Sequence, residues 1–163
     1  MQRLRIASID DINDIHSMFN SAKDKGRIDG TSDWDEDYPN REIIEEDITN
    51  EALYVLEDQG RIIASISLVE EEPEEIKDLG WEKARSCFLV RLCVAPEYQG
   101  KGIGGQVMKS ISLIAKKKGY KATHHLAAEV NQAANRLYKR MGYKDLGSIR
   151  VYDTNFIAYE MVL

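Results

Sequence analysis

The feature that most constrains the fold is a glycine-rich turn that joins an apolar strand to a helix. Residues 87–95, CFLVRLCVA, are apolar nearly throughout, which is typical of a central β-strand. The turn VAPEYQGKGIGGQ, residues 94–106, carries four glycines, and a helix with one apolar face follows it as far as Lys118. A further strand is expected at 123–129. The segment therefore predicts a parallel strand–helix–strand crossover.

Hydrophobic spacing and turn residues predict the rest of the chain. In chain order the expected elements are a strand at 3–7, helices at 12–25 and 39–50, strands at 52–58, 61–70 and 87–95, a helix at 102–118, a strand at 123–129, a helix at 131–141, and strands at 143–152 and 155–163. This order favours an α/β (α+β) fold with a mixed, mostly antiparallel, seven-stranded sheet flanked by about four helices. We expect a single domain over residues 1–163.

Two segments lack such spacing. Residues 26–40, GRIDGTSDWDEDYPN, are rich in Gly, Asp and turn formers, so we predict a long loop, and loops of this length are often functional. Its aromatic residues Trp34 and Tyr38 lie among four carboxylates. Residues 70–84 are predicted to be an acidic loop with at most one helical turn.

Charge is distributed unevenly along the chain. The net charge of −6 divides into −12 for residues 1–96 and +6 for residues 97–163. An anionic ligand would therefore favour the second part and a cationic ligand the first. No basic stripe interleaved with aromatic residues is present, so we expect no nucleic acid partner. No run approaches the ~20 apolar residues of a membrane helix, and the start of the chain has no signal-peptide core. We expect a cytoplasmic protein.

The cysteines and histidines give little sign of cross-linking or metal binding. Cys87 and Cys93 share one predicted strand, which separates their Cα atoms by about 20 Å, whereas a disulfide needs about 7 Å or less. We expect reduced core thiols. His124 and His125 are adjacent on a strand and would point to opposite faces. They lack metal-ligand spacing, so no metal is expected.

Three phosphate-binding patterns compete for the glycine-rich turn. Gly100, Gly102 and Gly105 match the dinucleotide pattern G-x-G-x-x-G. That fingerprint needs its first glycine at the end of the strand, whereas Pro96 to Gln99 intervene here, and it needs repeated crossover units. A triphosphate loop needs Gly-Lys-Ser/Thr, but the Gly-Lys here is followed by Gly102. The pattern Pro-x-x-Gln-x-x-Gly-x-Gly before a helix fits better, because helix N-terminal N–H groups bind pyrophosphate.

A second motif follows the next predicted strand. It consists of Asn131, Ala134, Leu137 and Tyr138, followed by Gly142 and Tyr143. With the turn, it resembles the GNAT superfamily of acyl-CoA N-acyltransferases. That family carries Q/R-x-x-G-x-G/A after its fourth strand, and then Asn-x-x-Ala-x-x-Leu-Tyr before Gly-Phe or Gly-Tyr. The motifs cover residues 87–143, and the expected element order matches the family over the whole chain. Gln99 replaces the commoner arginine, a usual variant.

The resemblance implies acetyl-CoA (coenzyme A) as the cofactor. In the family the strands at 87–95 and 123–129 splay apart, the pantetheine arm enters the gap, and the pyrophosphate lies on the amides of the turn. The cofactor-binding residues it implies are Leu92, Cys93, Val94, Gln99, Gly100, Lys101, Gly102, Ile103, Gly104, Gly105, Asn131, Ala134 and Tyr138. The alternative role of Asn131 is a helix N-cap.

The resemblance also implies direct amine attack with Tyr138 as general acid for the leaving thiolate. The alternative for Tyr138 is core packing, since it lies on the apolar face of its helix. Glu129 and Glu70 each end a predicted strand and are candidate bases, directly or through water. The Cys93 thiol is a less favoured candidate nucleophile, because direct transfer fits the family better.

The acceptor pocket is less well defined by the sequence. In the family, the loop between the first two helices and the last strand pair shape it. The residues that this implies here are Trp34, Glu36, Asp37 and Tyr38, with Tyr152 and Asp153 opposite. Acidic and aromatic groups suit a cationic amine. The expected acceptor is a primary amine of a small molecule, a polyamine or a peptide. Many relatives dimerise, so a homodimer is included among the expected assemblies.

Other functional classes remain as alternatives. The main one is a non-catalytic acyl-CoA-binding regulatory module on the same fold, against which Tyr138 argues. A nicotinamide oxidoreductase would bind NAD and ignore acetyl-CoA. A purely structural protein would make the two motifs coincidental.

Overall fold

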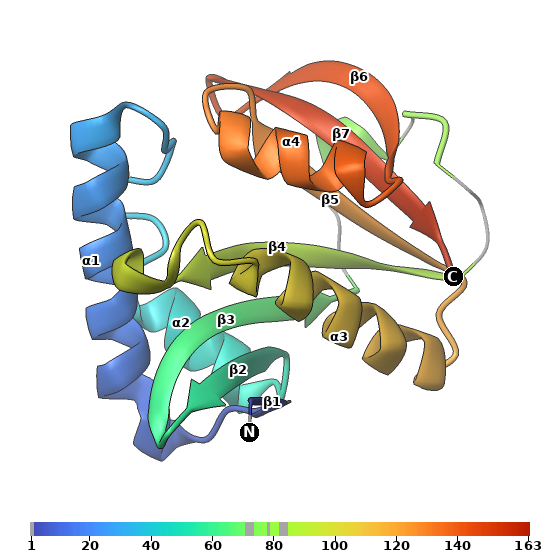
Figure 1. The fold of residues 1–163 in the computed structure, drawn as a ribbon. Helices are drawn as coiled ribbons and strands as arrows, with labels where there is room; N and C mark the ends of the chain where they lie inside the picture. The colour runs from blue at the N-terminus through green and yellow to red at the C-terminus, as the bar shows by residue number, and fades with distance from the viewer. Residues whose placement is uncertain (1, 71–73, 78, 82–84) are drawn as a thin grey trace.

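A computed structural model describes residues 2–70, 74–77, 79–81 and 85–163. Figure 1 shows a sheet with helices packed on both of its faces. The elements are β1 Arg3–Ile6, α1 Ile12–Asp29, α2 Arg41–Thr49, β2 Leu53–Asp58, β3 Arg61–Val69, β4 Ser86–Val94, α3 Ile103–Lys117, β5 Ala122–Ala128, α4 Gln132–Arg140, β6 Lys144–Val151 and β7 Thr154–Val162. This order confirms the predicted fold class.

The sheet has seven strands in the order β1-β2-β3-β4-β5-β7-β6. Only β4 and β5 run parallel, and every other neighbouring pair is antiparallel. The predicted crossover through α3 is therefore confirmed, and the apolar strand 87–95 does occupy the centre of the sheet. A dinucleotide fold would need further parallel units, which this sheet lacks.

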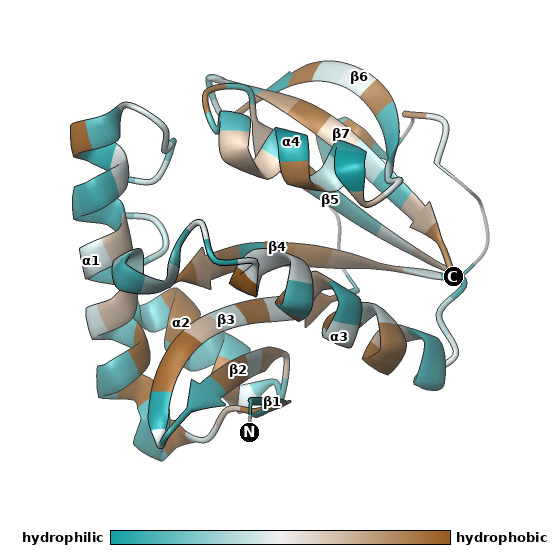
Figure 2. Cartoon of the chain, in the orientation of Figure 1, coloured by the Kyte–Doolittle hydropathy of each residue, from teal (hydrophilic) through white to brown (hydrophobic). Residues whose placement is uncertain are grey.

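Three apolar clusters hold the layers together. Helices α1 and α2 pack on one face through residues such as Ile15, Phe19 and Ile44. Helix α3 packs on the opposite face through Val107 and Ile111, and α4 joins the same cluster. A third cluster lies between β7 and the segment that precedes β4. Figure 2 shows hydrophobic colour concentrated on the strands and on one side of the helices. This arrangement buries the central strands on both faces.

Helix α1 is longer than the sequence predicts. It continues past the predicted end at Lys25 through Asp29, so the long loop spans residues 30–40 rather than 26–40. Gly26 is buried inside the helix because the returning chain lies against it, and a Cβ there would be 2.5 Å from the Ser32 Cβ. The glycine that signals a loop in the sequence is instead a packing glycine. The helix ends at Gly30, whose φ of 68° is left-handed.

Helix α2 starts at Arg41, two residues after the predicted start at 39, because Asn40 is its N-cap. The Asn40 side chain accepts a hydrogen bond of 2.9 Å from the Ile43 N–H, which caps the helix. Ile44 and Ile48 are buried, and Asp47 lies on the same buried face at 6% exposure. The burial of this carboxylate is a feature that the spacing alone does not reveal.

The remaining expectations concern thiols and the acidic stretch. Cys87 and Cys93 are both buried thiols at opposite ends of β4, as predicted. A short 3₁₀ helix, Glu74–Ile76, supplies the predicted helical turn, while residues 71–73, 78 and 82–84 of that stretch lie outside the described residues. Among the helices that the structure describes, none is long and apolar enough to cross a membrane.

The cap of α2 provides a test of the local fold. Replacing Asn40 with Ala removes the bond to Ile43, so the free energy of unfolding should fall by about 1 kcal/mol in urea titration. The control is Asn50→Ala at the other end of the same helix, where the side chain caps nothing. Equal losses from the two variants would contradict the capping role.

Candidate active site

The central strands separate along their length. β4 pairs with β5 only at Ser86–Ala122, Cys87–Thr123 and Phe88–His124. Both strands continue, β4 as far as Val94 and β5 as far as Ala128. The two strands therefore diverge beyond Phe88, and their facing backbone groups no longer bond to each other. This is the splay that the family resemblance predicts.

A β-bulge lies on the diverging part of β4. Ser65 of β3 pairs with Cys93 and Ser67 pairs with Val90, so β4 has one extra residue in this interval. Arg91 has the left-handed φ of 56°, a conformation that costs a non-glycine residue about 1 kcal/mol. The bulge redirects β4 at Leu92, which is one of the residues implied to contact the cofactor arm.

The turn after β4 leaves an open helix start. Gly100 and Gly102 have φ values of 74° and 81°, and a Cβ at either would meet no atom within 4 Å. Gly102 is also the N-cap of α3 and has no side chain to accept from the first-turn N–H groups. An α-helix leaves these donors without internal partners. The turn therefore offers unpartnered N–H groups in an open position, which is the arrangement that binds anions at helix N-termini.

Gln99, Gly104 and Gly105 also have structural roles in this turn. The Gln99 side chain donates a 3.0 Å hydrogen bond back to the Val94 carbonyl, which ties the turn to the end of β4. A Cβ on Gly104 or Gly105 would lie 3.3 or 3.4 Å from the Leu137 side chain. These glycines therefore permit α3 to pack closely against α4. Both also lie in the first turn of α3.

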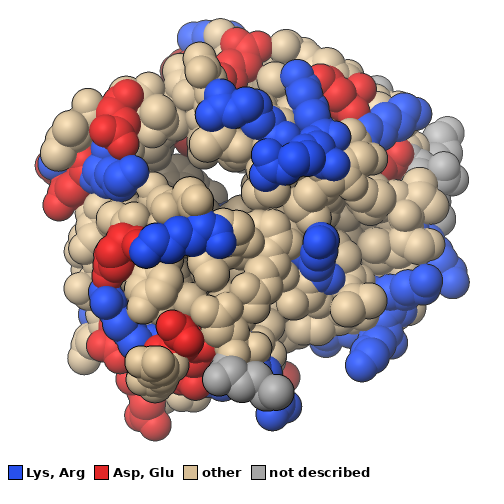
Figure 3. All heavy atoms as spheres, viewed as in Figure 1, with Lys and Arg blue, Asp and Glu red and all other residues tan. Residues whose placement is uncertain are grey.

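Positive charge gathers beside the turn. The Lys101 ammonium lies 5.6 Å from the centre of the Tyr98 ring, within cation–π range. Helix α4 carries Arg136, Lys139 and Arg140. Figure 3 shows a hollow between α4 and the turn before α3, with Lys and Arg side chains on both sides of it. An anionic ligand is therefore favoured here, as the charge of residues 97–163 predicts.

Asn131 serves as the N-cap of α4. Its side-chain oxygen accepts a 3.1 Å hydrogen bond from the Ala134 N–H. The alternative role given by the sequence is therefore present, and it occupies one end of the amide group. Asn135 is bound more fully, because it donates to the carbonyls of Ala128 and Asn131 and accepts from the Tyr159 hydroxyl.

Tyr138 lies between α4 and the sheet in a ring of aromatic side chains that it forms with His125, Tyr143 and Tyr159. It is 5% exposed, and its ring centre is 4.2 Å from that of His125 and 5.3 Å from that of Tyr159. Burial is the main reason that the pKa of Tyr138 is raised, and Tyr143 and Tyr159 add to it. The phenol therefore keeps its proton at neutral pH. Its side chain is packed as that of a core residue.

His125 is another buried member of this ring of side chains. It is 2% exposed, and neither ring nitrogen has a hydrogen-bond partner among the described residues. Burial, with a smaller effect of His124, lowers the pKa of His125 to about 3. The imidazole is therefore uncharged at neutral pH.

The two candidate bases lie in different places. Glu129 follows β5 at the diverging end and accepts a 2.7 Å hydrogen bond from the Ser148 hydroxyl. Glu70 follows β3 at the other end, beside the paired part of β4, where it accepts from the Tyr120 hydroxyl and lies 3.9 Å from Arg85. The structure therefore does not bring Glu70 to the turn or to Tyr138.

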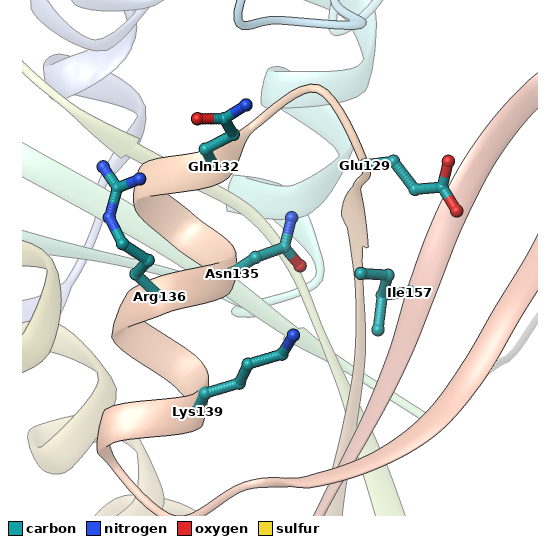
Figure 4. A pocket seen from close by; sticks show the side chains of 6 residues that line it. All are labelled: Glu129, Gln132, Asn135, Arg136, Lys139 and Ile157. Atoms are coloured by element: carbon teal, nitrogen blue, oxygen red, sulfur yellow. The ribbon is translucent and has the colours of Figure 1, made fainter.

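A pocket of about 290 Å³ lies beside α4. Its walls are formed by Glu129, Gln132, Asn135, Arg136, Lys139 and Ile157. Figure 4 shows Asn135 and Lys139 pointing from α4 toward Ile157 on β7. Tyr138 is not among the lining residues, but Asn135 lines the pocket and accepts the hydrogen bond from Tyr159, a member of the ring of aromatic side chains beneath the helix.

The loop between α1 and α2 is anchored from beneath. Trp34 packs on Phe19, with ring centres 5.3 Å apart. The Asp35 carboxylate accepts 2.9 Å bonds from the backbone N–H groups of Asp37 and Tyr38, which closes a tight turn. Burial raises the pKa of the neighbouring Asp33 carboxyl. Glu36, Asp37 and Tyr38 remain exposed.

Tyr152 and Asp153 form the two-residue turn between β6 and β7. Both have left-handed φ values, 51° and 60°, and Val151 pairs with Thr154 across the turn. The Glu129 N–H donates to the Asn155 carbonyl, which places this hairpin beside the end of β5. Among the described contacts, no hydrogen bond or ion pair joins the hairpin turn to the α1–α2 loop.

Three residues near the site were not predicted. Arg91 forms a two-point ion pair with Asp47, which also accepts a hydrogen bond from the Ser67 hydroxyl. The signal was present in the sequence, because a lone arginine inside the apolar strand CFLVRLCVA requires a buried partner. Asp47, next to Ile48 on the apolar face of its helix, is that partner.

The parted strands, the glycine-rich helix start and the α4 motif are those expected of an acyl-CoA N-acyltransferase. The chain belongs to the GNAT acetyltransferase family, because the acetyltransferase (GNAT) domain matches residues 49–145, more than half of the chain. The matched domain is thus an acetyltransferase domain by family. Acetyl-CoA is the cofactor of these enzymes.

Curated relatives match a part of the chain. A thialysine N-epsilon-acetyltransferase of Bos taurus is 36% identical over 64 residues, which is 39% of this chain and 38% of that protein. The protein of the same name from Sus scrofa is 36% identical over 62 residues. The match thus spans little more than a third of the length of these relatives.

Solved structures share the fold over nearly the whole chain. A GNAT-family acetyltransferase of Streptococcus agalactiae has a TM-score of 0.85 at 18% identity, covering 99% of this chain and 95% of that one. The PaiA N-acetyltransferase of Thermoplasma acidophilum, solved in complex with coenzyme A, has a TM-score of 0.74 at 19% identity, covering 100% and 99%. Likenesses at this identity show the fold alone.

The residues present fit acetyl-CoA. The backbone of β4 is released from β5 beyond Phe88, as a peptide-like arm requires. The cradle at Gly100 and Gly102 is open, and the hollow beside it is rimmed by Lys and Arg. Among the described residues, no cluster of His, Cys, Asp and Glu side chains could hold a metal.

His125 predicts acid sensitivity of the fold. The unfolded chain takes up a proton on this imidazole near pH 6.5, whereas the folded protein resists protonation down to about pH 3. The unfolded state therefore binds more protons in this window. The free energy of unfolding should fall by about 1.4 kcal/mol per pH unit as the pH drops from 6.5 toward 3.

Urea titrations at several pH values test this slope. His125→Phe should reduce the slope by about this amount, whereas Tyr143→Phe, in the same ring of aromatic side chains, should keep it. If His125→Phe leaves the slope unchanged, the imidazole does not remain neutral in the folded state.

Proposed function

We propose that this chain moves an acetyl group from acetyl-CoA to a primary amine of a small molecule, a polyamine or a peptide by direct attack. The observation that carries the proposal is the opening of β4 and β5 beside the uncapped glycine turn. The turn follows directly on the end of β4, so the proposed cradle adjoins the strand that borders the gap. Buried Tyr138 lies on the helix that follows β5.

The chain's own groups would hold the cofactor in three ways. Backbone groups at Leu92 and Val94 face a strand that has moved away, and the amides from Gln99 to Gly104 line the cradle. Because the Asn131 oxygen caps α4, only its NH₂ group is offered to the arm. Lys101 adds a positive charge, and Gly105 keeps α3 close to α4.

Tyr138 is the proposed general acid. Acetyl-CoA supplies an acetyl group activated as a thioester. The raised pKa of Tyr138 keeps a proton on its hydroxyl, so the phenol can donate to the departing sulfur. Glu129 is the proposed base, directly or through water, because it lies at the diverging end of β5. Glu70 lacks that support, since it is bound at the opposite end.

The proposed acceptor is a cationic alkylamine. Glu36 and Asp37 are exposed on the α1–α2 loop beside Tyr38, and this combination attracts an ammonium group. The relatives named for thialysine point the same way, toward an amine at the end of a side chain. Tyr152 and Asp153, on the hairpin turn, are the proposed opposite wall. We propose a cytoplasmic enzyme, and a homodimer is one of the assemblies that the resemblance implies.

One observation favours the non-catalytic alternative, an acyl-CoA-binding module. Tyr138 is only 5% exposed and is surrounded by aromatic rings, as a core residue would be. Such a module would bind acetyl-CoA and acetylate nothing.

Calorimetry and thiol release on one sample separate the two functions. Tyr138→Phe should lower kcat about 100-fold and weaken acetyl-CoA binding far less. The wild-type rate should show no alkaline loss from Tyr138 below pH 10, because burial raises its pKa above the usual value of about 10. Binding without turnover of any amine in a broad panel would instead establish the module.

The charge of the acceptor loop gives a second test. Glu36→Gln with Asp37→Asn should raise KM for a lysine-type or diamine acceptor about threefold to tenfold, because two attracting charges are lost. A neutral arylamine should be unaffected. The control is Glu42→Gln with Glu45→Gln, the same charge change on exposed positions of α2. Equal KM values for wild type and the loop variant would contradict a cationic acceptor.

A further inference from the structure

A charged group lies between β4 and the α1–α2 loop, and no step of the proposed reaction uses it. We propose that Arg91 is a positioning residue that fixes the acceptor loop, residues 30–40, against the cofactor strand through Tyr38, and so sets the affinity for the amine. The inference rests on the proposed function for its kinetic consequence. Its structural part stands on contacts alone.

Arg91 is held in one orientation by Asp47. Its Nε donates to the Asp47 Oδ2 at 2.8 Å, and its Nη2 donates to Oδ1 at 2.7 Å. The side chains are 15% and 8% exposed, so water competes little for the pair. Two parallel bonds fix the guanidinium plane, which a single ammonium group cannot do.

Asp47 is itself fixed from a second direction. The Ser67 hydroxyl donates a 2.7 Å hydrogen bond to its Oδ2, and Ser67 is 1% exposed on β3. The carboxylate therefore joins three elements: α2, β3 and β4. A carboxylate held by three hydrogen bonds has little freedom to move, so Arg91 is mounted on a rigid base.

The remaining nitrogen of Arg91 reaches the loop. Its Nη1 donates to the Tyr38 hydroxyl at 3.1 Å. The neighbouring Pro39 carbonyl accepts from the buried ammonium of Lys23 on α1. Two cations from different elements thus hold adjacent residues of the loop. Trp34, packed on Phe19, anchors its first half.

The place of Arg91 on β4 gives this anchor its role. Arg91 is the left-handed residue of the bulge, and Leu92 follows it directly. The bulge thus directs the Arg91 side chain toward the loop. The next residue, Leu92, belongs to the strand edge that is proposed to contact the cofactor arm. The distance between donor and acceptor sites is therefore fixed by one short segment.

Two variants test the anchor. Tyr38→Phe removes the exposed hydroxyl and keeps the ring, and Arg91→Lys keeps the charge beside Asp47 but loses the fork. Each should raise KM for the amine about tenfold, the equivalent of one hydrogen bond to a charged group. The Kd for acetyl-CoA by calorimetry should not change, and kcat should change much less than KM. Arg41→Lys, whose arginine bonds the exposed Asn13, is the matched control.

The double variant distinguishes anchoring from general damage. If the two residues act through one bond, Tyr38→Phe should add nothing to the KM of Arg91→Lys. Additive effects, or an unchanged KM in Tyr38→Phe, would overturn the proposal.

Fluorine NMR supplies a readout that does not depend on turnover. The chain has two tryptophans, so 5-fluorotryptophan labelling gives two signals, and Trp34→Phe assigns them. Tyr38→Phe and Arg91→Lys should shift or broaden the Trp34 signal and leave that of Trp81 in place. An unmoved Trp34 signal in both variants would overturn the anchor. If the wild type acetylates no amine, the proposed function fails, and this measurement alone still decides whether Arg91 holds the loop.

Discussion

The parallel ladder between β4 and β5 joins the two halves of the sheet over Ser86–Phe88 and then ends, although both strands continue. Parallel strands normally share their bonds along their whole overlap. Here the ladder stops where β4 begins to bend toward its bulge, and β5 instead keeps its antiparallel bonds to β7 along Ala122–Ala128. The gap that results is bounded by backbone, and its position is set by the fold rather than by any mobile loop.

The other parts of the site are arranged around that gap. The glycine turn follows the free end of β4, and α4 follows the free end of β5, so the proposed anion cradle and the proposed acid Tyr138 lie on the segments that continue from the two parted strands. Gly104 and Gly105 permit the two helices to approach through Leu137. The acidic first part of the chain supplies the loop on the far side of β4. The proposed acceptor site thus lies in the acidic part of the chain, and most of the proposed cofactor site lies in the basic part.

The sequence predicts the element order, the central strand and the glycine-rich turn before α3 well, because each depends on local spacing and on turn residues. It places the end of α1 wrongly, since Gly26 serves packing against Ser32 rather than a turn. Local spacing does not reveal contacts between distant segments. The contacts of Arg91 with Asp47 and Tyr38, for example, join residues that lie far apart in the chain. The location of Glu70 at the paired end of β4 likewise depends on strand register and not on the residue type.

Glycine amides offer the most direct measurement of the central claim, that acetyl-CoA binds at the open end of β4 on the turn before α3. In protein labelled with ¹⁵N-glycine, eleven amide signals report on the whole fold. Titration with acetyl-CoA should shift Gly100, Gly102, Gly104 and Gly105, and leave Gly26, Gly30 and Gly60 unmoved. Shifts confined to the latter group, or none at saturating cofactor, would contradict the account.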